Sequence, residues 1–523
     1  MAVVNNPGVS RLLQFQLPKL CVAVSGLTTD EMLAKAEAVA RDNSFVELRL
    51  DYLPDPRSAL PRIRQFLESR PLVTAMATCR RASSGGRFRG SVPSEIEILS
   101  KAAVAGCQLL DVELETAERI KSEQLQKLRS KAGLVVSFHD FRRTHNLEKT
   151  LRKMAAYRAD FYKIVATATA LYDNVVMMKF LERYCDQHSL VGLCMGEQGL
   201  ISRVLGLRSG SLFTFGAIAG DDKTAPGQIT SQELLATYRI DRLDAATRVY
   251  GVAGDPISHS LSPAIMNAAL RRENVNGVFL ALHTKSLKDL LACVREIPIH
   301  GLSITMPYKQ AILPYLDNSD PHTVKIGACN TVVRSQDGKL YGFNTDTSGV
   351  VRPLEQRLAL NDARILVLGA GGAARAAVFG LSARGAEIFL VNRSPAAAQK
   401  LARQAKARTL KRAELKRLDF DVIINATPVG MGNTRESPLN GEEIRARFVF
   451  DMVYDPAETR LLQLARQRGA EIIPGSEMFV HQAARQFEIW TGKPAPREDM
   501  LRIVRLALDE RGAARNGSKA RAS

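Results

Sequence analysis

The chain has 523 residues, a length that corresponds to about three domains and is long enough to bury several cores without disulfides or metals. Hydrophobic residues make up 46% and charged residues 24% of the sequence, and no run of 18 apolar residues occurs, which excludes a membrane-spanning helix. Lys and Arg total 72 against 54 Asp and Glu, and the net charge of +18 permits nucleic acid, anionic surfaces or anionic substrates as partners.

The seven cysteines are odd in number and form no Cys-x-x-Cys pair. This spacing argues against a disulfide framework and against a structural zinc site, and it is typical of a reducing compartment. The first 20 residues carry neither a signal-peptide apolar core nor an Arg/Ser-rich transit pattern. We therefore expect a cytoplasmic protein without a bound metal.

Eight short apolar runs alternate with helical patterns in the first half of the chain. They cover residues 19–26, 44–53, 71–80, 108–115, 131–141, 160–168, 189–196 and 212–218. Near-continuous apolar strands that alternate with helices are typical of parallel strands covered by helices. An open doubly wound sheet is the alternative, but eight strands favour a (β/α)8 TIM barrel, which we place at residues 17–240.

Polar side chains stand where these predicted strands end, and barrel enzymes carry their chemistry at that face. These side chains are Glu47, Arg49, Asp51, Arg80, His139, Asp140, Lys163 and Arg203. Several cations together suit a substrate with a carboxylate. Lys163 has apolar neighbours, and a desolvated lysine has a lowered pKa and can form an imine with a carbonyl. From the residues alone, a lysine that extends from a strand end to solvent is the favoured interpretation.

Six segments in this half resemble the type I 3-dehydroquinate dehydratases, which are Schiff-base (β/α)8 enzymes. They are ELRLD (47–51), TCR (78–80), SFHDF (137–141), YKI (162–164), MGEQGLISR (195–203) and TAPGQI (224–229). The resemblance implies that Lys163 forms the imine and that His139 is the general base and then the general acid. It also implies a set of substrate-binding residues, namely Glu47, Arg49, Arg80, Arg203, Thr224 and Gln228.

Two positions depart from this family. Ser84 precedes Gly85-Gly86 where the family usually has a Glu that orients the base histidine, so we expect slower proton transfer. Thr224 replaces a serine and keeps its hydroxyl group. Ser84 therefore leaves an alternative open, in which the barrel is a weakly active or inactive dehydratase-like scaffold.

A polar stretch at 238–247 predicts a linker, and a second α/β region begins at Val249. Within it, the glycine-rich segment 368–375 follows a predicted strand and opens a predicted helix, a context in which helix N–H groups approach a pyrophosphate. The next strand ends in Asn392-Arg393-Ser394 instead of an acidic residue, which favours NADP(H) over NAD(H). A glycine turn without a ligand is the alternative.

The second half resembles shikimate dehydrogenase over residues 249–510. The matching segments are GDPISHSLSPAIMN (254–267), GLSITMPYK (301–309), GACNTVV and GFNTD within 327–346, NATPVGM (425–431), DMVY (451–454) and GSEMFVHQA (475–483). The resemblance implies an acid–base pair of Lys309 and Asp346. It implies substrate binding by Ser260, Ser262, Thr305, Asn330 and Gln482, and cofactor binding by Gly369, Ala370, Gly371, Gly372, Ala373, Asn392, Arg393, Ser394, Thr427 and Met452.

Two details of this half refine the expectation. The hydroxyl groups of Ser260, Ser262 and Thr305 favour shikimate over quinate as the preferred alcohol. Ser303 stands where the family usually has Asn, and we expect this change to affect loop packing more than chemistry.

Together the two halves resemble the fused dehydroquinate dehydratase–shikimate dehydrogenases that are typical of plants. The resemblance implies dehydration of 3-dehydroquinate to 3-dehydroshikimate, followed by its NADPH-dependent reduction to shikimate. We expect a barrel at 17–240, a shikimate-binding domain at 248–348, a Rossmann NADP-binding domain at 349–475, C-terminal helices returning to the substrate domain at 476–510 and a disordered tail at 511–523.

The basic stretch 403–417 raises nucleic-acid binding as a further hypothesis. We predict a surface helix here, and the stretch lacks the interleaved aromatic residues that stack on bases, which indicates a solvated face. The expected partners are therefore small-molecule substrates, without nucleic acid and without a membrane.

Overall fold

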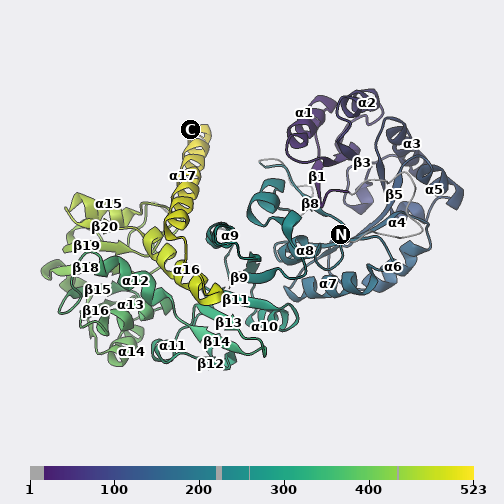
Figure 1. Cartoon of the computed structure of the whole chain (residues 1–523). Coiled ribbons are helices and arrows are strands. Elements are labelled where there is room, and N and C mark those ends of the chain that lie inside the picture. Colours follow the sequence, from purple (N-terminus) through teal and green to yellow (C-terminus); the bar gives the residue numbers. More distant parts are fainter. Residues whose placement is uncertain (1–16, 220–226, 258–259, 433–434, 523) are drawn as a thin grey trace. The chain divides into compact units, whose positions relative to one another are not determined.

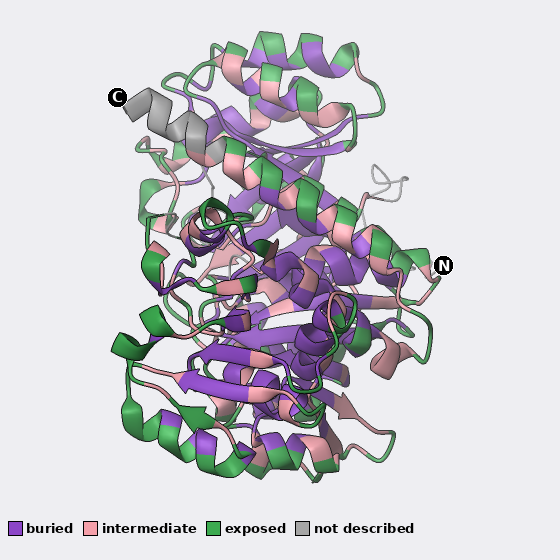
Figure 2. Cartoon of the chain, turned by 90° about the vertical axis from the view of Figure 1, so that its left-hand side faces the viewer, coloured by how far each residue is buried: buried purple, intermediate pink, exposed green. Residues whose placement is uncertain are grey.

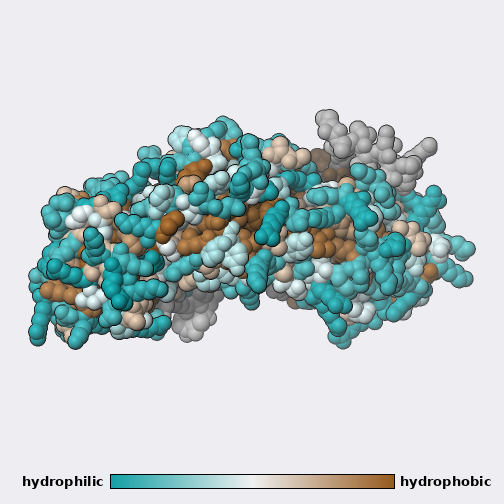
Figure 3. All heavy atoms as spheres, turned by 90° about the horizontal axis from the view of Figure 1, so that it is seen from below, coloured by the Kyte–Doolittle hydropathy of each residue, from teal (hydrophilic) through white to brown (hydrophobic). Residues whose placement is uncertain are grey.

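The computed structural model describes residues 17–219, 227–257, 260–432 and 435–522 (Figure 1). The chain divides into two compact units: residues up to Thr247 together with Leu282–Ile297, and Arg248–Ala281 together with the residues from Pro298 on. In the described part of the chain, no helix is both long enough and apolar enough to cross a membrane. Hydrophilic side chains cover most of the face drawn in Figure 3.

The first unit contains one parallel sheet in the order β7-β6-β5-β4-β3-β2-β1-β8. Its strands are β1 (Leu20–Val24), β2 (Phe45–Arg49), β3 (Thr74–Thr78), β4 (Leu109–Glu113), β5 (Gly133–His139), β6 (Phe161–Thr167), β7 (Leu190–Met195) and β8 (Thr214–Gly216). The Leu212 N–H, just before β8, donates to the Leu190 carbonyl at the start of β7 (2.9 Å), which nearly closes the sheet into a barrel. The prediction of eight strands and a barrel is confirmed.

Helices follow the strands and cover the outside of this barrel. They are α1 (Thr29–Ala40), α2 (Leu60–Glu68), α3 (Val92–Val104), α4 (Leu114–Ala117), α5 (Ser122–Arg129), α6 (Leu147–Ala155), α7 (Tyr172–Tyr184) and α8 (Leu200–Leu205), with short helical turns at η1 (Leu50–Tyr52), η2 (Ala82–Ser84), η3 (Glu233–Thr237) and η4 (Ile240–Arg242). The polar stretch 238–247 is not an exposed linker throughout, because Tyr238 and Ile240 are buried.

Side-chain alternation along the strands determines which residues face the inside of the barrel. On β6, Tyr162 and Ile164 belong to the cluster that packs against the helices, whereas Phe161 and Val165 belong to the inner cluster. Lys163 lies between the two inner residues with the same parity, so the strand directs its side chain inward. Strand β6 is buried from Phe161 to Ala166, and the strands drawn in Figure 2, which faces the second unit, are likewise mostly buried.

The second unit begins with a mixed sheet in the order β10-β9-β11-β13-β14-β12. Its strands are β9 (Arg248–Gly254), β10 (Gly277–His283), β11 (Ile299–Ile304), β12 (Asn318–Ser319), β13 (Thr331–Arg334) and β14 (Leu340–Phe343). The helices in this stretch are α9 (Ser262–Arg272), α10 (Leu287–Glu296), η5 (Leu313–Tyr315), α11 (Pro321–Ile326) and α12 (Asp346–Glu355). Of these, α10 clusters with the first unit.

A parallel sheet in the order β17-β16-β15-β18-β19-β20 follows, which is a Rossmann arrangement. Its strands are β15 (Arg364–Leu368), β16 (Glu387–Val391), β17 (Arg408–Thr409), β18 (Phe420–Asn425), β19 (Ala446–Asp451) and β20 (Glu471–Ile473). The accompanying helices are α13 (Gly372–Ser382), α14 (Pro395–Ala405), η6 (Arg412–Arg417), η7 (Gly441–Glu443) and α15 (Arg460–Gln467). The strand order reverses between β15 and β18, where ligands bind in sheets of this kind.

Two long helices, α16 (Gly475–Thr491) and α17 (Arg497–Ala522), complete the chain. Phe479 and Phe487 of α16 and Met500 of α17 share one apolar cluster with Tyr250 of β9, so both helices pack on the first sheet of this unit. The tail that we predicted to be disordered from Arg511 instead continues α17. Two arginines of this segment have a fixed partner, because Arg511 and Arg515 both donate to Asp455, at 2.9 and 2.7 Å.

The basic stretch 403–417 is not the single surface helix that we predicted. Helix α14 ends at Ala405, Lys406 adopts a left-handed conformation (φ 56°), and β17 then adds to the sheet edge before η6 begins. Three of its cations pair with acids: Arg408 with Glu387, Arg412 with Glu443 and Lys416 with Glu442. These pairs neutralise much of the charge that had suggested nucleic acid.

Candidate active sites

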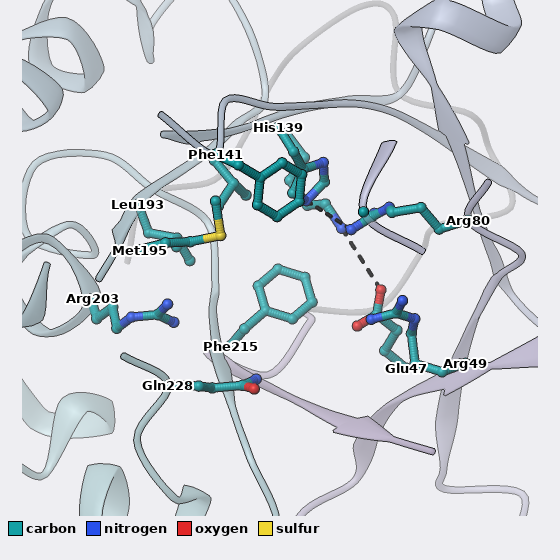
Figure 4. A pocket seen from close by; sticks show the side chains of 13 residues that line it. Glu47, Arg49, Arg80, His139, Phe141, Leu193, Met195, Arg203, Phe215 and Gln228 are labelled. Atoms are coloured by element: carbon teal, nitrogen blue, oxygen red, sulfur yellow. Dashed lines mark hydrogen bonds and ion pairs between the residues drawn. The ribbon is translucent and has the colours of Figure 1, made fainter. Parts of the chain in front are cut away.

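A polar pocket lies at the carboxyl ends of the barrel strands (Figure 4). It is lined by Glu47, Arg49, Arg80, Gly85, His139, Phe141, Lys163, Val165, Leu193, Met195, Arg203, Phe215 and Gln228. Seven of the expected dehydratase residues are thus brought together, and Thr224 lies outside the described residues. Side-chain alternation along the strands explains the convergence. On β2 and β6, Glu47 and Lys163 come two residues after Phe45 and Phe161 of the inner apolar cluster, so they point into the barrel nearer to the carboxyl ends of the strands.

Lys163 lies in the floor of this pocket and is 2% exposed. Its Nζ donates to Oδ2 of Asp111, lies 3.7 Å from Oε1 of Glu47 and stands 4.6 Å from the centre of the Phe215 ring. The sequence predicted an apolar environment for Lys163. The structure differs, because two carboxylates hold the ammonium in place. Asp111 is buried as well, and the nearby Lys163 and Arg80 lower its pKa to about 2 in spite of its burial.

His139 ends strand β5 with its Nε2 2.9 Å from Nη1 of Arg80. An arginine has no acceptor, so Nε2 must accept this hydrogen bond and the ring proton must reside on Nδ1. Burial, Arg80, Lys163 and Arg49 all lower the pKa of His139 to well below its usual range. The imidazole is therefore neutral at pH 7 and available as a base.

Two further arginines, Arg49 and Arg203, line the pocket. The guanidinium of Arg49 donates twice to the buried carboxylate of Asp51, at 2.9 Å each, and Asp51 also accepts from the Arg87 backbone N–H at 3.0 Å. Arg203 is 1% exposed, and burial lowers its pKa to about 10. A buried guanidinium of this kind is suited to bind the carboxylate of a substrate.

Ser84 ends the short turn η2 and does not line the pocket, whereas the next residue, Gly85, does. Gly85 has a φ of 79°, and a Cβ added to it would lie 2.2 Å from Cζ of Phe141. Among the described residues, no hydrogen bond uses the Ser84 hydroxyl and no carboxylate from this turn contacts His139.

A second polar cluster lies in the other unit, between β11, β13 and α12. Nζ of Lys309 donates to Oδ2 of Asp346, and Nδ2 of Asn330 donates to Oδ1 of the same carboxylate at 2.8 Å. Asn330 also lies 3.4 Å from Oε1 of Gln482 on α16. Four of the expected residues are therefore joined in one hydrogen-bonded group, with Asp346 buried and Lys309 partly open to solvent.

The remaining substrate residues of this half surround the ends of β9 and β11. The Ser262 N–H at the start of α9 donates to the Ser260 hydroxyl at 3.2 Å, and Thr305 directly follows β11. Ser303, inside β11, accepts a hydrogen bond from Nε2 of Gln486 at 3.1 Å. Ser303 thus ties β11 to α16 and has a packing contact in the structure.

The glycine turn after β15 can accommodate a pyrophosphate. Gly369 has a φ of 115°, which only glycine adopts readily, and a Cβ there would lie 3.0 Å from the carbonyl of Ala426. Gly371 precedes α13 without a side-chain cap, and a Cβ on it would meet open space. Free helix N–H groups beside open space fit the cofactor phosphates. A Cβ on Gly372 would lie 3.3 Å from the side chain of Lys309, so this turn adjoins the acid–base pair.

Arg393 follows β16 at the position that reads the cofactor ribose and is exposed. It lies between Asn392 and Ser394, and Nδ2 of Asn392 donates to the Ser394 carbonyl at 3.0 Å. No salt bridge to a described carboxylate involves Arg393, and its guanidinium suits a 2′-phosphate. Ala370 and Ala373 flank the glycine turn in the sequence.

Two further expected cofactor residues are held by a buried network that the sequence did not reveal. Oδ1 of Asn425 accepts from the Thr427 hydroxyl at 2.7 Å, and the Met452 N–H donates to the Asn425 carbonyl at 3.0 Å. Asp451 accepts from Asn425 (2.9 Å) and from the Thr459 hydroxyl (2.6 Å). Burial raises the pKa of Asp451 to about 6.

Asp111 and Glu113 of β4 were also missed by reasoning from the sequence. Both have inward parity in LLDVE, where charged residues alternate with Leu110 and Val112. That alternation of charged and apolar residues in one strand is the signal that could have found them. Among the described residues, no group of three or more His, Cys, Asp or Glu side chains could hold a metal ion.

Four family models match the chain in the order of its domains. The type I 3-dehydroquinase model matches residues 20–245, and the shikimate dehydrogenase substrate binding domain matches 252–332. The shikimate / quinate 5-dehydrogenase model matches 353–447, and the shikimate 5'-dehydrogenase C-terminal domain matches 475–505.

Similar proteins match either nearly the whole chain or its second half alone. The bifunctional 3-dehydroquinate dehydratase/shikimate dehydrogenase, chloroplastic, of Arabidopsis thaliana is 34% identical over 93% of this chain and 84% of its own length. A shikimate dehydrogenase (NADP(+)) of Dehalococcoides mccartyi is 38% identical over 50% of this chain and 96% of its own. The structure of shikimate 5-dehydrogenase from Thermus thermophilus with NADP(H) and shikimate is 35% identical, covers 50% of this chain and 100% of its own, and has a TM-score of 0.48.

Fold and sites define a lyase barrel joined to a two-lobed nucleotide-dependent oxidoreductase. The chain belongs to the family of bifunctional 3-dehydroquinate dehydratase/shikimate dehydrogenases. It is a shikimate-pathway enzyme that acts on small-molecule substrates, and NADP(H) is the cofactor of its second half.

Proposed function

We propose that the barrel pocket dehydrates 3-dehydroquinate through an imine at Lys163. The ammonium of Lys163 gives up a proton and its amine adds to the ring ketone; two of the original ammonium protons then leave with the ketone oxygen as water, and an iminium remains. His139 takes a proton from the adjacent carbon, and the electron pair of that bond forms an enamine. The imidazolium returns this proton to the departing hydroxyl, which leaves as water, and hydrolysis of the iminium then releases 3-dehydroshikimate and Lys163.

The observation that carries this proposal is the convergence of Lys163, His139 and Arg203 on one buried pocket. Arg203 binds the substrate carboxylate, and the polar side chains of the opposite wall bind the ring hydroxyls. This wall comprises Glu47, Arg49, Arg80 and Gln228, and Thr224 is assigned with them from the family pattern.

We propose that Lys309 and Asp346 form the acid–base pair of the second reaction. NADPH supplies the hydride when it is bound. Lys309 donates a proton to the alkoxide oxygen that forms at the former ketone, and Asp346 holds the ammonium in position. Asn330 fixes Asp346, and with Gln482 it faces the substrate ring. Ser260, Ser262 and Thr305 bind the rest of the substrate and favour shikimate over quinate.

The cofactor residues follow from the same placement. We assign the pyrophosphate to Gly369, Ala370, Gly371, Gly372 and Ala373, the ribose 2′-phosphate to Asn392, Arg393 and Ser394, and the nicotinamide side to Thr427 and Met452. The functional domains are accordingly 17–240, 248–348, 349–475 and 476–510, and partners other than small molecules are not needed for either reaction.

Six of the seven cysteines are buried and all are free, which supports a reducing compartment, and we place the protein in the cytoplasm.

One assay tests both halves. With 3-dehydroquinate and NADPH the enzyme should consume NADPH, and borohydride added with 3-dehydroquinate should leave a substrate-sized mass on Lys163. Lys163→Ala should lose the adduct and the consumption of NADPH from 3-dehydroquinate, but should still reduce added 3-dehydroshikimate. A wild-type enzyme that forms no adduct would refute the barrel mechanism and favour the inactive scaffold. Comparing kcat/KM for shikimate and quinate with NADP+ tests the substrate preference.

A further inference from the structure

The contact between His139 and Arg80 raises the question of what holds the arginine. Two buried carboxylates of β4 face its guanidinium: Oδ2 of Asp111 lies 3.3 Å from Nη2, and Oε1 of Glu113 lies 3.3 Å from Nε. Asp111 and Glu113 are both 2% exposed. Arg80 is therefore fixed on one side by acids and presents its remaining nitrogen, Nη1, to the histidine.

The two acids are not equivalent. Asp111 is shared, because its carboxylate also accepts from Lys163 and from the Ser137 hydroxyl at 2.5 Å. Glu113 instead has its charge partner in Arg80, and its second oxygen accepts from the Arg81 N–H at 3.3 Å. Neither Nε of Arg80 nor Oε1 of Glu113 has a hydrogen-bond partner among the described residues, so the 3.3 Å ion-pair contact between them is the polar interaction that these two buried atoms make.

The Glu113 contacts also connect the turn that contains Ser84 with the histidine. The Arg81 backbone, which Glu113 holds, leads directly into η2, the turn from which a carboxylate would reach His139 in the family. This chain has no carboxylate there, yet a buried acid holds both the start of the turn and the arginine on the imidazole.

We propose that Glu113 is a positioning residue for the dehydration, and that it acts through Arg80 to orient His139 and to keep its proton on Nδ1. This inference rests on the proposed role of His139. It assigns to a Glu113–Arg80–His139 chain the task that the family gives to the acid before the paired glycines, and it explains how the barrel can remain active with Ser84.

The raised pKa of Glu113 is consistent with the Glu113–Arg80–His139 contacts and gives them a pH dependence. Burial raises its pKa to about 8, Arg80 opposes this rise, and Glu95 and Asp111 add to it. The groups that face Glu113 are thus Arg80, the Arg81 backbone, Glu95 of α3 and Asp111 of its own strand. His139 is faced by Arg80, Lys163 and Arg49. Glu113 gains its charge as the pH rises through about 8 and then forms an ion pair with Arg80, so the rate of proton transfer should rise over that range.

The test compares Glu113→Gln with Glu95→Gln in the full chain. Glu95 is equally buried, but it contacts the Thr116 hydroxyl (2.9 Å) and Arg81 (3.9 Å), and Arg80 is not among its hydrogen-bond or salt-bridge partners in the described structure. We expect Glu113→Gln to lower the dehydratase kcat about tenfold at pH 9, where Glu113 of the wild type is ionised, with KM changed less than about twofold, and to remove the rise near pH 8, so that the two enzymes differ little at pH 6. Glu95→Gln should keep the kcat and the pH profile of the wild type.

Three further measurements keep structural damage apart from lost positioning. Borohydride should still trap the adduct on Lys163 in Glu113→Gln, and reduction of added 3-dehydroshikimate should be unchanged. Adding Ser84→Glu to Glu113→Gln should restore most of the rate, because it returns a carboxylate to the histidine. If Glu113→Gln does not fold, Glu113→Asp decides, since its shorter side chain keeps the charge but withdraws it from Arg80.

The proposal is overturned if Glu113→Gln matches Glu95→Gln in kcat and pH profile, if Ser84→Glu gives no rescue, or if Glu113→Asp retains the wild-type rate. A wild-type enzyme with neither turnover nor adduct would instead overturn the dehydratase mechanism itself. The two failures are therefore distinguishable.

Discussion

Asp111 is the carboxylate on which the barrel site depends most, and Asp111→Asn removes its charge while keeping its shape. The pKa of this group is about 2 in the folded chain and 3.8 for an ordinary aspartate. One pKa unit corresponds to about 1.4 kcal/mol, so the lowered pKa means that the ionised form contributes roughly 2 kcal/mol to folding at pH 7. Asparagine resembles the protonated acid, and we expect a loss of that size.

The sign of the pH dependence follows from the direction of the shift. Because the folded pKa is depressed, the contribution of Asp111 is fully present above pH 3.8 and is lost as the pH falls toward 2. The stability difference between the wild type and Asp111→Asn should therefore be constant from pH 5 to 7 and should shrink below pH 4. Glu97→Gln, which removes an exposed acid of α3, should leave the unfolding midpoint unchanged.

The assay can distinguish the two units because Trp490 on α16 is the single tryptophan of the chain. Its fluorescence reports urea unfolding of the second unit, whereas circular dichroism reports both. Asp111→Asn should shift the circular dichroism transition to lower urea. Equal midpoints for Asp111→Asn and the wild type by both probes at pH 7 would refute the electrostatic account of the site.

The remaining predictions concern the second unit. Lys309→Ala should lower kcat for the reduction of added 3-dehydroshikimate at least about 100-fold without changing the dehydratase rate, and steady-state assays of both reactions will check this. Arg393→Ala should raise the KM for NADPH about tenfold and leave the KM for NADH nearly unchanged, which distinguishes a 2′-phosphate contact from a general loss. Asp451→Asn should stabilise this unit at pH 8 by up to about 3 kcal/mol, because a pKa raised from 3.8 to about 6 means that ionisation opposes folding, fully above pH 6. The gain should shrink as the pH falls from 6 toward 3.8 and vanish below that, as measured by Trp490 fluorescence.

Strand periodicity predicted the barrel well because each strand is apolar on both faces, toward the helices and toward the inner cluster. The same parity places Lys163 inside. Which side chains then touch depends on the register between neighbouring strands, as in the pairing of Glu113 with Ser137 and of Ser137 with Lys163. Register is a tertiary property, and it explains why the role of Asp111 beside Lys163 could not be predicted from the sequence.

Local propensity failed where tertiary contacts or single backbone conformations decide the structure. The basic stretch after Ala405 reads as a continuous helix, but Lys406 in the left-handed region ends α14, and β17 then pairs with β16. The composition of the small polar tail predicts disorder, whereas Arg511 and Arg515 pair with Asp455 in the structure. In both places the composition of the segment does not reveal which distant residues the segment contacts.

The free-energy cost of burying the charged guanidinium of Arg203 argues against the view that the barrel is only a scaffold. Burial lowers its pKa from 12.5 to about 10, so its charge in the folded state is unfavourable by about 3 kcal/mol. A scaffold would be more stable with an apolar side chain there, since buried charges are replaced by hydrophobic residues at a gain. A bound carboxylate offsets this penalty when it pairs with the guanidinium, and such local instability is typical of functional sites. The buried Arg203 therefore favours a barrel that still binds an anionic substrate.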